Sequence, residues 1–183
     1  MKMRITAFPG LVALTLALSP SAWATPAQIL IIRHAEKPAT GIDLSPEGYE
    51  HAQKLVTYFE SNPEVTQYGT PAAIFAMTSS GEDESRRPLE TVTPLATALG
   101  IKIHEKFGKD DLNALSQKIM SDASLDGKMV LICWEHHVIP DLARGLGAKD
   151  APDSWNNDDF TSVWELDFEG DKVAGFRIFK QQL

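Results

Sequence analysis

The sequence has little cysteine, few basic residues and only one long apolar run. Its single cysteine, Cys133, cannot form a disulfide within the chain, and no metal site can be built from cysteine pairs. Cys133 ends the apolar run Met129 to Cys133, which favours a buried core residue over a nucleophile. Acidic residues outnumber basic ones by 25 to 17. We therefore expect no nucleic-acid partner, because phosphate backbones need clustered Lys and Arg. A small phosphorylated substrate stays compatible, because it responds to the local field of a pocket.

The one long apolar run lies at the start of the chain and has the layout of a secretory signal peptide. Two basic residues precede an apolar segment from Ile5 to Leu18, and the small residues of a cleavage site follow at Ala22-Trp23-Ala24. The segment is shorter than the roughly 20 residues that span a bilayer. We expect residues 1–24 to be a signal peptide and residues 25–183 to be a single domain. That domain would be exported, periplasmic or secreted, and would have no membrane contact once the signal is removed. Losing two basic residues and no acid would take the formal net charge from −8 to −10.

Strand-like and helix-like segments alternate along residues 25–183. Apolar runs of strand length are Gln28–Ile32, Ala72–Met77, Ile101–Ile103 and Met129–Cys133. Apolar residues at helical spacing follow in segments that begin near Pro46, Leu89, Leu112 and Ile139. The last two runs, Ser162–Phe168 and Lys172–Phe179, flank Gly170 as in a hairpin. The alternation predicts an α/β fold with three layers, α/β/α, and a mainly parallel sheet with a C-terminal strand pair.

Residues suited to binding phosphate follow three of the expected strands. Arg33 and His34 come directly after the first strand, Arg87 lies in or just after the loop that leaves the second, and His136 follows the fourth. In sheets of this kind the site lies beyond the carboxyl ends of the strands, so these side chains should converge. Arginine offers a fixed fork of donors to phosphate oxygens and stays charged at any working pH. A neutral histidine can attack phosphorus while a second one stabilises the transferred group. The set predicts a phosphoryl-transfer site.

Four sequence motifs occur in a fixed order and spacing, and together they indicate a protein family more specifically than any one motif does. They are Ile31-Ile32-Arg33-His34-Ala35-Glu36, Leu44-Ser45-Pro46-Glu47-Gly48, Arg87-Pro88-Leu89-Glu90-Thr91 and the segment from Val130 to Pro140. Together they resemble the histidine phosphatase superfamily, also called phosphoglycerate mutase-like, over about residues 28 to 147. The resemblance implies the phosphoglycerate mutase-like fold. It also implies that the protein is an enzyme that needs neither a metal ion nor a cofactor. It also implies hydrolysis of phosphate monoesters of small molecules through a phosphohistidine intermediate.

The resemblance assigns roles to individual residues. His34 would be the phosphorylated nucleophile, and Arg33 and Arg87 would bind the phosphoryl group. The second histidine of the phosphate pocket would be His136. The family's usual Gly-His or Ser-His is replaced here by Trp134-Glu135-His136-His137, so two adjacent histidines compete for that role. We favour His136 over His137, because it is nearer to the end of the strand.

The general acid that protonates the leaving oxygen is less well marked. Family members of the mutase type carry a glutamate after the third strand, in a segment that ends in aromatic-Gly. Glu105-Lys106-Phe107-Gly108 resembles that segment but is one residue short. We predict Glu105 as the acid and keep Glu135 as an alternative.

Other functions remain compatible with these residues. A mutase-like phosphotransferase would use the same phosphohistidine, although export would separate it from cytoplasmic substrates. A catalytically silent protein would bind a phosphorylated ligand without turnover. A metal site built from His34, Glu36, His136 and His137 is disfavoured, because the neighbouring arginines would repel a cation. The sequence predicts neither the natural substrate nor the oligomeric state.

Overall fold

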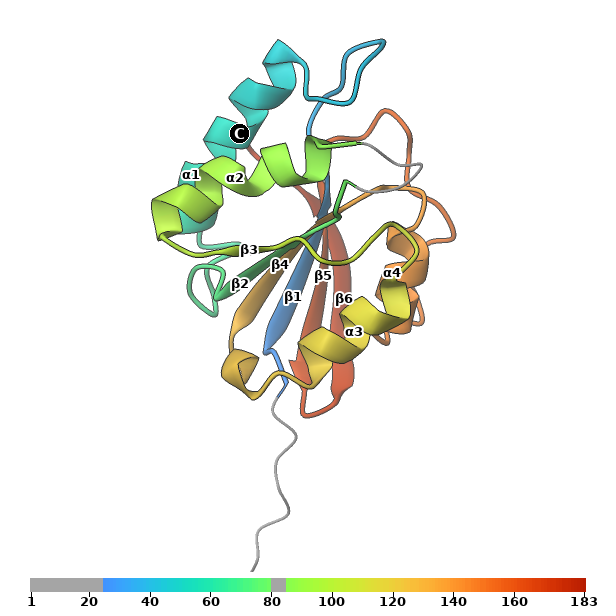
Figure 1. The fold of residues 1–183 in the computed structure, drawn as a ribbon. Coiled ribbons are helices and arrows are strands. Elements are labelled where there is room, and N and C mark those ends of the chain that lie inside the picture. Colours follow the sequence, from blue (N-terminus) through green and yellow to red (C-terminus); the bar gives the residue numbers. More distant parts are fainter. Residues whose placement is uncertain (1–24, 80–84) are drawn as a thin grey trace, which may run out of the picture.

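Strands and helices alternate in the computed structural model, which describes residues 25–79 and 85–183 (Figure 1). The strands are β1 (Gln28–Arg33), β2 (Ala73–Ala76), β3 (Ile103–His104), β4 (Met129–Trp134), β5 (Ser162–Glu169) and β6 (Lys172–Lys180). The helices are α1 (Pro46–Ser61), α2 (Arg87–Leu99), α3 (Leu112–Met120) and α4 (Ile139–Gly145), with a short 3₁₀ helix, η1 (Ala123–Leu125). The expected signal peptide, residues 1–24, lies outside the described residues. Within the described part of the chain, no helix has the length and apolar character that a membrane span needs.

All six strands form one sheet in the order β3-β2-β4-β1-β5-β6. Strand β1 pairs in parallel with β4, and β2 pairs in parallel with both β4 and β3. Strand β5 runs antiparallel to β1, and β6 runs antiparallel to β5. The predicted mainly parallel sheet with a C-terminal strand pair is therefore confirmed.

Helices cover both faces of the sheet, with α1 and α2 on one face and α3 and α4 on the other (Figure 1). Successive side chains of a strand point to opposite faces, so β1 contributes to two cores. Leu30 and Ile32 pack with side chains of α1 and α2, whereas Ile29 and Ile31 pack with side chains of α3 and α4. Every residue of β1 is buried. Burying one such aliphatic side chain contributes about 1.5–3 kcal/mol, so the two cores together hold the end of β1 in place.

Helix α1 begins in close contact with the loop that follows β1. The Ser45 side chain accepts a hydrogen bond from the Gly48 N–H at 3.1 Å and caps the helix. The Ser45 N–H donates to the Glu36 carbonyl at 3.0 Å. A Cβ at Gly48 would lie 2.3 Å from that same carbonyl oxygen, so only glycine allows this approach. The Leu44–Gly48 motif thus fastens the loop that carries His34.

The third strand is where the sequence-based prediction of the elements was wrong. The apolar run predicted a strand over Ile101–Ile103, but β3 comprises only Ile103 and His104. Gly100 adopts a left-handed conformation, φ 65°, at the end of α2. The Ile101 N–H then donates to the Ala96 carbonyl at 3.0 Å, which completes the helix cap. The first part of the apolar run is therefore used to end the helix.

Candidate active site

His34 lies directly after β1, at the carboxyl end of the sheet. Its backbone N–H donates to the Trp134 carbonyl at 3.3 Å, so it continues the pairing of β1 with β4. Its side chain is buried, and Nδ1 lies 2.7 Å from the Ala35 carbonyl oxygen. A carbonyl oxygen only accepts, so Nδ1 carries the proton. In the neutral ring Nε2 therefore keeps its lone pair.

Burial decides the charge of His34. It lowers the pKa of this ring from 6.5 to about 4, against the opposing effect of the hydrogen bond to Ala35. The positive charges of Arg33 and Arg87 lower the pKa further. The ring is consequently neutral at pH 7, which is the form in which a histidine acts as a nucleophile.

Arg33, the last residue of β1, is almost completely buried, with 1% of its surface exposed. Its Nη1 donates to the Asn157 carbonyl at 2.6 Å and the Asp159 carbonyl at 3.3 Å, and its guanidinium lies 3.9 Å from the centre of the Phe160 ring. Burial lowers the pKa of Arg33 to about 10, although Glu135 and Asp159 oppose the shift, so the group stays charged at pH 7. Its buried Nε has no hydrogen-bond partner among the described residues. An unmet buried donor costs about 1–3 kcal/mol, and an anion would satisfy it.

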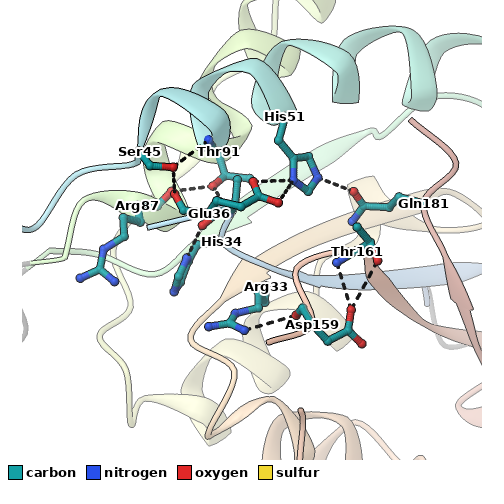
Figure 2. A network of polar contacts seen from close by, with 12 residues as sticks. Arg33, His34, Glu36, Ser45, His51, Arg87, Thr91, Asp159, Thr161 and Gln181 are labelled. Carbon is teal, nitrogen blue, oxygen red and sulfur yellow. Dashed lines mark hydrogen bonds and ion pairs between the residues drawn. The ribbon is translucent and has the colours of Figure 1, made fainter. Parts of the chain in front are cut away.

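Arg87 is held near His34 by the start of α2. The Thr91 hydroxyl donates to the Arg87 carbonyl at 2.7 Å and accepts from the Ala35 N–H at 2.9 Å, so it links the helix to the loop after β1 (Figure 2). Arg87 is half-buried, and within the described residues its guanidinium donates to the carbonyls of residues 41 and 42, at 3.3 Å. Among the described residues no carboxylate pairs with it, whereas its neighbour Arg86 pairs with Asp43. Within the described part of the chain, no carboxylate thus neutralises the charge of Arg87.

The two arginines and His34 extend toward the same side of the chain (Figure 2). His136 joins them from the end of β4, with its ring centre 6.5 Å from that of His34. His136 is buried, and its Nε2 lies 2.9 Å from the Asn157 side-chain oxygen. His137 is 64% exposed. The structure thus brings Arg33, His34, Arg87 and His136 together, and this placement supports the choice of His136 over His137.

The two candidate acids lie in different surroundings. Glu135 is paired with both neighbouring histidines; burial would raise its pKa, but these partners hold it at about 2. A carboxylate that is ionised at pH 7 has no proton to give, so this geometry argues against Glu135 as the acid. Glu105 follows the edge strand β3 and is exposed. No contact joins it to the other site residues described, so its role stays a prediction.

Glu36 belongs to a different network, on the side of the loop that faces α1. Its carboxylate accepts from His51 Nδ1 at 2.9 Å, and His51 Nε2 lies 2.6 Å from the Gln181 side-chain oxygen (Figure 2). Burial would lower the pKa of His51, but these two hydrogen bonds together raise it. This network joins α1 to the C-terminal segment. It also removes Glu36 from any metal site built with His34.

Two residues of the site were missed by the sequence analysis, Asn157 and Phe160. Both come from the loop between α4 and β5. Asn157 contacts Arg33 through its carbonyl and His136 through its side chain, and the Phe160 ring lies 6.1 Å from that of His34. The richness of residues 148–161 in Asn, Asp and Pro marks a loop, but the pattern gives no sign of which side chains face the site.

No protein-family model matches the sequence, and no curated protein matches it. Solved structures do match. The protein histidine phosphatase SixA complexed with tungstate superposes with a TM-score of 0.63 at 11% identity, covering 84% of this chain and 97% of that one. A phosphoglycerate mutase from Plasmodium falciparum gives 0.56 at 18% identity, covering 87% and 94%. A putative alpha-ribazole-5'-P phosphatase from Escherichia coli gives 0.52 at 14% identity, covering 84% and 96%. These likenesses confirm the predicted phosphoglycerate mutase-like fold.

The state of His34 can be measured by its titration. We expect the ring to remain neutral at about pH 5, with the proton on Nδ1, because its folded-state pKa is about 4. An unfolded chain would bind this proton near pH 6.5, so the group lowers stability as the pH falls from 6.5 towards 4. Imidazole ¹⁵N shifts followed against pH check both the pKa and the tautomer. A midpoint near 6.5, or a proton on Nε2, would contradict the geometry.

Proposed function

We propose that this protein is a phosphatase that hydrolyses phosphate monoesters through a phosphohistidine on His34. The observation that carries the proposal is the state of that ring. Its Nδ1–H is held by the Ala35 carbonyl, and burial keeps it neutral between two arginines. A neutral imidazole with a free Nε2, placed among cations, suits attack on an anionic phosphorus centre. The structural likeness to phosphatases of the same fold supports the proposal.

The proposed reaction has two displacements at phosphorus. Arg33, Arg87 and the Nε2–H of His136 bind the phosphoryl oxygens, and the Asn157 side chain gives up its contact with His136. Nε2 of His34 forms a bond to phosphorus, the ester P–O bond breaks, and the leaving oxygen takes a proton from the general acid. The deprotonated acid then takes a proton from water as the water attacks the phosphohistidine, the N–P bond breaks, inorganic phosphate leaves, and Nε2 regains its lone pair. The protein mainly aligns the group and stabilises its charge.

A mutase-like phosphotransferase is the second candidate, since one of the matching structures is a phosphoglycerate mutase. It would use the same phosphohistidine but return the phosphoryl group to a substrate. We favour hydrolysis because residues 1–24 have the layout of a signal peptide, and we infer from it that the protein is exported. Outside the cytoplasm the priming phosphates of a mutase are absent, whereas water is always available.

The direct test of the proposed activity is an assay of the purified protein on a panel of phosphate esters. We expect turnover that persists with a chelator and falls at least about 10³-fold in His34→Ala, because loss of a nucleophile removes the covalent route. His104→Ala is the matched control, because His104 is an exposed histidine on β3. Full activity in His34→Ala would refute the proposal. Activity that is lost with chelator and restored by a divalent ion would indicate metal catalysis instead. Binding of phosphate without turnover would favour the silent-binder alternative.

The role of Glu105 can be tested through the leaving group. An alkyl phosphate needs its leaving oxygen protonated, whereas p-nitrophenol leaves as an anion. If Glu105 is the acid, Glu105→Gln should lower kcat/KM for an alkyl phosphate by about 10²- to 10⁴-fold and change that for p-nitrophenyl phosphate far less. Glu47→Gln, an exposed carboxylate in the first turn of α1, is the control. Equal rates for wild type and Glu105→Gln on both substrates would exclude Glu105.

A further inference from the structure

We propose that Glu135, His136 and His137 form an inhibitory binding site for a transition-metal ion of the zinc class. The binding of the ion is independent of the proposed phosphatase function, whereas the inhibition rests on it. One carboxylate oxygen and one nitrogen from each ring lie within 4.8 Å of one another. Glu135 Oε1 is 2.9 Å from His136 Nδ1 and 2.7 Å from His137 Nδ1. Imidazole nitrogen and carboxylate oxygen are ligands that zinc takes in proteins.

The buried ring of His136 points to a ligand at this place. Its Nε2 lies 2.9 Å from the Asn157 side-chain oxygen, an acceptor, so Nε2 carries a proton. The other ring nitrogen, Nδ1, is buried and has no hydrogen-bond partner among the residues that the structure describes. The atom it faces at 2.9 Å is an oxygen of the Glu135 carboxylate. A zinc-class ion bound between the two atoms would take the place of a proton on Nδ1, and both atoms would then be ligands of one cation.

The ion can reach these atoms from solvent. His137 is largely exposed and lines a polar cavity of about 660 Å³ together with residues 153–158. Asp153 and Asp158 in that wall favour the approach of a cation. Two positive side chains near Glu135 weaken the binding of a cation. Lys109 Nζ lies 3.8 Å from the Glu135 carboxylate, and Arg33 interacts electrostatically with the same carboxylate. We therefore expect an affinity in the micromolar range, weaker than that of a closed structural zinc site.

Binding should disturb the phosphate pocket. Zinc ligands at about 2.0–2.1 Å in tetrahedral arrangement stand roughly 3.3 Å apart, further than the 2.7 and 2.9 Å seen here. The ring of His136 or the Glu135 carboxylate must therefore move by about half an ångström. His136 lies against His34 and Asn157, so it cannot move without changing the alignment of the phosphoryl group. Misplacement on this scale is enough to slow a phosphoryl transfer by one or two orders of magnitude.

The experiment is a calorimetric titration of the purified protein, made without a histidine tag, with zinc chloride. We expect one ion per chain and an affinity at least about tenfold lower in His137→Gln, because the variant loses a ligand. Glu135→Gln should also weaken binding. His104→Gln, which removes an exposed histidine elsewhere, should bind as wild type does. Melting temperatures of all variants show that each is folded.

Activity provides the second readout. Zinc at saturation should lower wild-type turnover about tenfold or more and should have much less effect on His137→Gln, whose activity without zinc is unchanged. No calorimetric binding by wild type, or equal affinities for wild type and His137→Gln, would overturn the site. Specific binding with unchanged turnover would overturn the inhibition alone. If the protein proved to have no phosphatase activity, the calorimetric comparison would still decide whether the site exists.

Discussion

The register of β1 against β4 is the constraint on which the candidate site depends. The parallel pairs run from Gln28 with Met129 to Arg33 with Trp134, so the residues that follow leave the sheet at the same level. Both faces of β1 are covered by packed side chains and both of its edges are paired. A slip of one residue would turn every side chain of β1 to the opposite face, so the cores hold the register. The position of His34 beside His136 is thus a consequence of how β1 packs in the two cores, away from the site itself.

Burial at the end of β1 also determines the charges of His34 and Arg33. It removes the proton from His34 and leaves Arg33 charged, because their intrinsic affinities for a proton differ by many orders of magnitude. Among the residues that the structure describes, the backbone carbonyls of Asn157 and Asp159, and no carboxylate, accept the hydrogen bonds of Arg33, so its charge is only partly neutralised. The Thr91 hydroxyl holds Arg87 near His34, because it accepts a hydrogen bond from the Ala35 N–H and donates one to the Arg87 carbonyl. A neutral imidazole and cations that are at most partly neutralised by described residues therefore coexist in one small volume.

Much of this arrangement could be predicted from the sequence. Continuous apolar runs predicted β1 and β4, because parallel strands that are buried on both faces consist mainly of apolar residues. The position of Arg33 and His34 at the end of the first run then placed them at the carboxyl edge of the sheet. The contributions of Asn157 and Phe160 could not be predicted, since the path of an irregular loop depends on tertiary contacts with residues more than 120 positions away. The short β3 was misplaced because a helix cap used its first apolar residue, which no periodicity reveals. The general acid stays a prediction for a similar reason: Glu105 follows the edge strand β3, and no described residue makes a hydrogen bond or ion pair with its side chain.

The central claim is that Nε2 of His34 carries the phosphoryl group, and the position of the phosphate on the ring tests it most directly. The protein would be mixed rapidly with a phosphate ester, quenched in alkali and digested, and the phosphohistidine identified by mass spectrometry and ³¹P NMR. Because Nδ1 is engaged with the Ala35 carbonyl, the account predicts an acid-labile phosphate on His34, attached at Nε2 and formed fast enough to account for turnover. Phosphate attached at Nδ1, phosphate on another residue, or turnover with no phosphoenzyme would contradict it.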